Sequence, residues 1–171
     1  MQDRWSMTDP NLATYLDDHL AGAVAALEVL EHLEKAHAGA PVARALSELR
    51  TEVDADREAL QSLMTQLRVT ESKPRKAAAW LAERLASLKL RLDDSGDGAF
   101  RLFESLEVVS LGIEGKLALW RTLAAVAPVL PDVGSLDYET LMLRAAEQRE
   151  RAEGMRLRAA QTAFAGVSSS P

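Results

Sequence analysis

Several residue types are scarce in this chain of 171 residues, and their scarcity excludes several classes of fold and of functional site. Cysteine is absent, which excludes disulfides, thiolate metal sites and cysteine nucleophiles. Aromatic residues make up only 5% of the chain, and there are 9 glycines and 6 prolines, whereas alanine and leucine are abundant. This composition argues against a β-sandwich or β-barrel and favours helices. The sequence therefore predicts an all-α protein.

The chain also lacks an excess of positive charge and a long apolar run. Its 20 Lys and Arg residues stand against 26 Asp and Glu residues, a formal charge of −6, so a basic surface for nucleic-acid phosphates is not expected. A strongly apolar window at 117–130 contains Arg121 and is shorter than the roughly 20 residues of a membrane span. Residues 1–6 lack the hydrophobic segment of a signal peptide. We therefore expect a cytoplasmic protein that binds neither nucleic acid nor membranes.

The remaining sequence shows helical periodicity. Apolar spacing predicts four long helices over about 10–37, 42–67, 99–127 and 138–159, and a shorter one over about 77–92 between the second and third long helices. Asp9 before Pro10 is a start signal for the first helix. Long amphipathic helices bury their apolar faces by packing together, so we expect a four-helix bundle over 10–165. An N-terminal arm, 1–9, precedes it, and a disordered tail, 166–171, follows it.

Polar residues interrupt the apolar faces of three long helices, at Asp56, Ser110 and Gln148. If these residues lie at one level, they form a buried hydrogen-bond network that sets the register of the helices. The interior of a bundle is also where carboxylate-bridged metal sites are built. The candidate ligands of such a site are His19, Asp56, Glu107, Glu114 and Gln148. Both interpretations stay open at the level of sequence.

Two stretches, Tyr15–Gly22 and Ser110–Trp120, together with the interposed short helix, resemble an uncharacterised bacterial branch of the ferritin-like superfamily over about residues 10–165. The resemblance implies a ferritin-like four-helix bundle. Metal enzymes of that superfamily carry a Glu-x-x-His pair on the second and fourth bundle helices. The matching positions here read Val53-x-x-Asp56 and Ala145-x-x-Gln148. Neither the imidazole nor the glutamate is present, so no ligand can be carried over.

A second metal motif lies in residues 93–104, which match the twelve-residue calcium loop. Its oxygen ligands would be Asp93, Ser95, Asp97 and Glu104. Gly98 stands at the turn position, but Arg101 replaces the usual oxygen residue at position nine, and Phe103 is expected on the apolar face of the next helix. The alternative is a turn in which Asp97 caps that helix.

Gly112-x-x-Gly115-Lys116 lies inside a predicted helix. A phosphate-binding loop joins a strand to a helix, so this context excludes one. Each glycine in mid-helix costs roughly 1 kcal/mol relative to alanine. We expect the close approach of a neighbouring helix, or of a second copy of the chain, to account for them.

Taken together, these patterns predict a ferritin-like bundle without a di-iron centre or other cofactor, acting as a structural or interaction protein and forming a homodimer. One alternative is a di-metal oxidase or iron-storage protein with atypical ligands. The other is a calcium-binding helical module that uses loop 93–104. All 3 histidines fall between residues 19 and 37 and no Ser–His–Asp set is visible, so we predict no catalytic residue.

Overall fold

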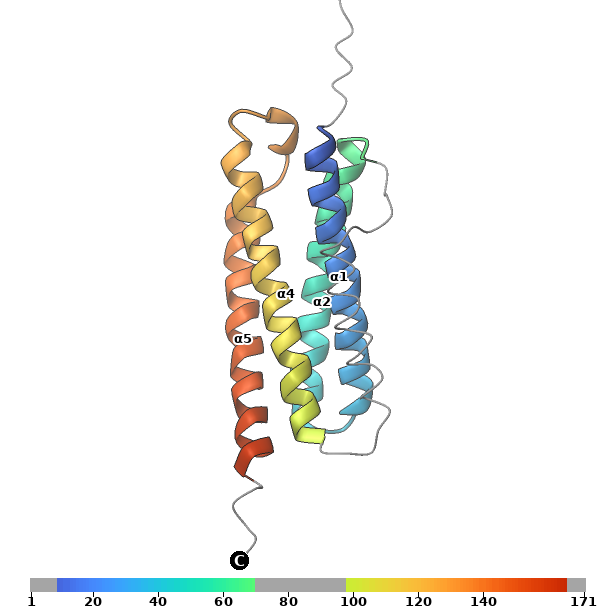
Figure 1. The fold of residues 1–171 in the computed structure, drawn as a ribbon, viewed down its shortest axis with the longest axis vertical. Helices are drawn as coiled ribbons and strands as arrows, with labels where there is room; N and C mark the ends of the chain where they lie inside the picture. Colours follow the sequence, from blue (N-terminus) through green and yellow to red (C-terminus); the bar gives the residue numbers. More distant parts are fainter. Residues whose placement is uncertain (1–8, 70–97, 166–171) are drawn as a thin grey trace, which may run out of the picture.

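The computed structural model of the chain describes residues 9–69 and 98–165. Within these ranges the chain forms α1 (Pro10–Ala36), α2 (Pro41–Gln66), α4 (Gly98–Val126) and α5 (Tyr138–Ala165), with a 3₁₀ turn, η1 (Pro131–Val133), before α5 (Figure 1). The predicted all-α four-helix bundle is confirmed. The short helix predicted over about 77–92 lies outside the described residues. None of the helices in the described ranges is both long enough and apolar enough to span a membrane.

The helices form two antiparallel pairs. In Figure 1, α1 and α5 run in one direction and α2 and α4 in the other. α1 packs on α2, α4 packs on α5, and the pairs meet mainly through α1 and α4, whereas α2 and α5 touch much less. The end of α2 and the start of α4 lie at opposite ends of the bundle, so a short turn cannot join them.

Local signals set the helix ends. The side chain of Asp9 accepts hydrogen bonds from the backbone N–H groups of Asn11 at 2.7 Å and Leu12 at 3.4 Å, and Pro10 occupies the first turn of α1. Gly39, with φ at 83°, supplies the left-handed conformation in the turn that leads to α2. The start of α1 agrees with the start signal that the sequence carries at Asp9 and Pro10.

The apolar core is divided into two clusters along the bundle. One contains Leu63, Leu117 and Ala145, and the other contains Val53, Ile113 and Ala152. Each of α2, α4 and α5 therefore contributes to both clusters. Three polar residues of the interior lie between these positions on the three helices: Asp56 on α2, Lys116 on α4 and Gln148 on α5.

Candidate functional site

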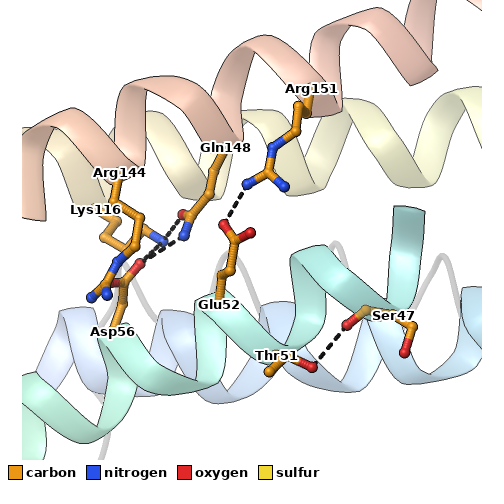
Figure 2. Close-up of polar contacts among 8 residues, drawn as sticks. All are labelled: Ser47, Thr51, Glu52, Asp56, Lys116, Arg144, Gln148 and Arg151. Atoms are coloured by element: carbon orange, nitrogen blue, oxygen red, sulfur yellow. Dashed lines mark hydrogen bonds and ion pairs between the residues drawn. The ribbon is translucent and has the colours of Figure 1, made fainter. Parts of the chain in front are cut away.

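Four side chains form a polar layer between the two apolar clusters: Asp56 from α2, Lys116 from α4, and Arg144 and Gln148 from α5 (Figure 2). Asp56 and Gln148 follow the apolar spacing of their helices, so both side chains point inward and are buried. Lys116 precedes buried Trp120 by one helical turn, and Arg144 precedes Gln148 by the same spacing. This spacing places both cations beside the buried faces.

The carboxylate of Asp56 accepts hydrogen bonds at both of its oxygens. Lys116 Nζ donates to Oδ2 at 2.5 Å, Gln148 Nε2 donates to Oδ2 at 3.1 Å, and Arg144 Nη2 donates to Oδ1. The ammonium of Lys116 also donates to Gln148 Oε1. Asp56 is therefore paired with two cations and one amide, which provides the compensation that a buried charge requires.

The polar layer carries a net positive charge, since one carboxylate faces two cations. The side chain of Asp56 is 0% exposed, that of Lys116 12% and that of Arg144 33%. Burial lowers the pKa of Lys116 below its usual range, although the neighbouring Asp56 carboxylate acts in the opposite direction. The loss of hydration therefore changes the pKa of Lys116 more than the attraction of the Asp56 carboxylate does.

A second ion pair continues this polar contact between α2 and α5. Arg151 Nη2 donates to Glu52 Oε2, one turn from Asp56 along α2 (Figure 2). The hydrogen bond from Arg151 is the main cause of a lowered pKa at Glu52. Both side chains are partly exposed, so this pair is screened by water more than the pair at Asp56.

The structure brings Asp56 and Gln148 together but places the other predicted network residue elsewhere. Ser110 is half-buried, and the buried face in this half of α4 runs through Ser105 and Val109 instead. Position 110 lies at the edge of that face. His19 is half-buried on α1, 4.6 Å from the ring of Tyr15 in an edge contact, and burial lowers its pKa.

The two glutamates proposed as metal ligands face arginines of α5. Glu107 lies 3.4 Å from Arg156, and Glu114 lies 2.7 Å from Arg149. Neither interacts with Asp56 through any hydrogen bond or ion pair found in the described part of the chain. Within 9–69 and 98–165, no group of three or more Asp, Glu or His side chains is arranged to hold a metal ion.

The candidate calcium loop falls only partly within the described residues. Asp93, Ser95 and Asp97 lie outside them, whereas Gly98 and Glu104 are in the first two turns of α4. The loop therefore stays a prediction.

Sequence reasoning missed Lys116 and Arg144. In the sequence, Lys116 stands out only as the last residue of Gly112-x-x-Gly115-Lys116, and no predicted motif includes Arg144. The signal that the sequence does carry is a cation one helical turn from a buried position, whereas its level relative to Asp56 depends on how the helices pack.

No protein-family model matches the chain, and no curated protein matches it. Among solved structures, that of the E. coli stress protein YciF is similar, with a TM-score of 0.58 and 14% sequence identity over 94% of this chain and 96% of that chain. The similarity supports an all-α helical-bundle fold for this chain.

Proposed function

We propose that this protein is a ferritin-like bundle in which a layer of ion pairs occupies the interior position that a di-metal centre takes in other members. In this proposal the protein has a structural or interaction role and forms a homodimer. The observation that carries this proposal is the pairing of Asp56 with Lys116 and Arg144. The layer is then a device that holds α2 and α5 in register.

The chemistry of the donor set argues against a resident di-iron centre. Such a centre needs several carboxylates and imidazoles around the ions. Asp56 already accepts from Lys116 and Arg144, and a divalent cation beside these two cations would be repelled. Glu107 and Glu114 are engaged with arginines instead.

Exposed apolar side chains on α5 support an interaction role. Leu143, Leu157 and Phe164 are exposed and recur at spacings of fourteen and seven residues, which places them on one side of the helix. The ring of Phe164 lies 6.1 Å from that of Phe100 and 5.5 Å from that of Phe103 on α4. These side chains are separated along α5, with exposed Glu150 between Leu143 and Leu157, and they are the proposed contact points of the homodimer.

Metal binding is tested by elemental analysis of the purified protein, followed by anaerobic Fe²⁺ titration and oxygen-uptake measurements. We expect no stoichiometric iron and no oxidase turnover. Binding of two iron equivalents with oxygen consumption would overturn the proposal in favour of the di-metal alternative.

Calorimetry with millimolar Ca²⁺ should show no binding heat. A heat abolished by Glu104→Gln would favour the calcium alternative.

Sedimentation velocity tests the homodimer. We expect Leu143→Glu/Leu157→Glu to shift the protein from dimer to monomer, because the change places charge on the exposed apolar side of α5. Val24→Glu is the control, since Val24 is exposed on α1. A wild-type protein that is monomeric at tens of micromolar would contradict this part of the proposal.

A further inference from the structure

A cavity of about 330 Å³ lies beside the polar layer, bounded by residues of α1, α2 and α4. Its α1 wall includes the small residues Gly22, Ala23 and Ala26, beside the larger Asp18, His19 and Leu30. The three small residues fall between Leu20 of one apolar cluster and Val29 of the other. The short side chains of these three residues leave part of the space at this level unfilled.

The two glycines of α4 have no close neighbour on the other described helices. Gly112 and Gly115 both line the cavity, and a Cβ built on either would meet no atom of the described residues within 4 Å. The sequence-based expectation that a neighbouring helix approaches them closely is therefore wrong for the described helices. Both glycines have a lower helix propensity than alanine, and their lack of a side chain leaves space for the cavity.

The cavity also has a hydrogen-bond donor to offer. Trp120 lines it and is almost fully buried, but its Nε1, which has no acceptor in the part of the chain that the structure describes, is covered by neighbouring atoms and is not open to the cavity. Lys116, one turn earlier on the same helix, lines the cavity as well. Its ammonium has three N–H groups, and the hydrogen bonds to Asp56 and Gln148 use two of them. A buried N–H without an acceptor is costly, so a ligand oxygen at this point would be stabilising.

We propose that this cavity is a binding site for a small, uncharged, mainly apolar molecule that carries one hydrogen-bond-accepting oxygen, such as an aromatic ketone. The size fits, since an apolar protein cavity of about 150 Å³ accommodates benzene. The oxygen accepts from Lys116 Nζ, and the apolar body lies against the glycines of α4 and the small residues of α1.

The charges around the cavity favour a neutral ligand. Asp18 and Asp56 on its wall are balanced by Lys116 and by Arg144 behind Asp56. His19, also on the wall, has its pKa lowered by burial and is mainly neutral at pH 7. An anionic ligand would lie near the Asp18 carboxylate and would compete with Asp56 for the same cations.

The experiment compares three probes of similar size by titration calorimetry and ligand-observed NMR on the full chain. Acetophenone has the apolar body and the acceptor, ethylbenzene lacks the acceptor, and benzoate is anionic. We expect saturable one-to-one binding of acetophenone, with ethylbenzene and benzoate each weaker by roughly tenfold. Equal binding of acetophenone and ethylbenzene would overturn the role of the donor.

Variants locate the site. Gly115→Leu should abolish acetophenone binding while the protein stays helical and folded, because the leucine side chain enters the cavity. Gly154→Leu is the matched control, since Gly154 is a mid-helix glycine of α5 that does not line this cavity. Lys116→Met should reduce the preference for acetophenone over ethylbenzene, because it removes the donor on the cavity wall. The proposal is overturned if wild-type protein shows no saturable binding at millimolar acetophenone, or if Gly115→Leu binds as well as wild type.

Discussion

Gln148 on α5 donates a hydrogen bond of 3.1 Å to Asp56 on α2, two residues separated by 92 positions in the sequence. The bond joins the two neighbouring helices that otherwise touch least. With the ion pairs of Asp56 to Arg144 and of Glu52 to Arg151, it makes the contact between α2 and α5 largely polar. The two helix pairs are therefore held to each other by packing between α1 and α4 and, on the opposite side, by directed polar contacts between α2 and α5.

Removing the carboxylate of the polar layer should strongly destabilise the protein. Asp56→Ala leaves Lys116 and Arg144 without their buried partner, and we expect the free energy of unfolding to fall by about 3–5 kcal/mol. Urea denaturation followed by circular dichroism measures it. Asp54→Ala is the control on the same helix, because Asp54 forms a partly exposed i,i+3 pair with Arg57, and its loss should cost under about 1 kcal/mol. Equal effects of the two variants would contradict this account of the layer.

Replacing the whole layer with apolar side chains should be far less harmful than removing one member. In Asp56→Leu/Lys116→Met/Arg144→Leu/Gln148→Leu no charge or amide of the layer is left unpaired, and burial of apolar surface replaces the ion pairs. We expect a free energy of unfolding equal to or above that of the wild type, because buried ion pairs rarely surpass well-packed apolar residues in stability. Denaturant titration measures the free energy of unfolding. If the quadruple variant loses more of it than Asp56→Ala does, the polar layer is a net source of stability.

The mid-helix glycines of α4 should tolerate alanine. Gly112→Ala and Gly115→Ala each add a methyl group into open space and raise helix propensity, so each should raise the free energy of unfolding by about 0.5–1 kcal/mol. Gly39→Ala is the contrasting variant, since φ of 83° at this position strains any residue with a Cβ, and it should lower stability. Destabilisation by both α4 variants would indicate that the glycines are needed for close packing after all.

His19 should make the protein less stable in mild acid. Its pKa is lowered in the folded state by burial, against an ordinary value of 6.5, so the unfolded chain takes up the proton more readily. The stability contributed by neutral His19 is complete above pH 6.5 and is lost as the pH falls through 6.5 toward the lowered value. Asp18 reduces this effect because its charge raises the pKa. We expect His19→Gln to lose less stability than wild type between pH 7.5 and 5, as measured by urea denaturation at both values. His32→Gln is the control.

The ends of the described helices could be predicted from sequence because they depend on neighbouring residues. Asp9 caps α1 through backbone groups two and three positions away, and Gly39 ends the turn through its own φ angle. The inward placement of Asp56 and Gln148 also follows from local spacing, since each replaces an apolar residue in a regular helical repeat. Helix ends and the inward placement of these two residues can therefore be predicted without knowing where another helix lies.

The partners of those two buried residues were decided by the tertiary structure. Helical spacing gives the face on which a side chain lies, but not its level against a second helix. Packing alone brought Lys116 and Arg144 to the level of Asp56 and turned Glu107 and Glu114 toward arginines of α5. The cavity has the same origin, since it exists only where the small residues of α1 stand opposite Gly112 and Gly115. Contacts between helices depend on their relative shift and rotation, which are set by the sum of all packing interactions and not by any one segment of the chain.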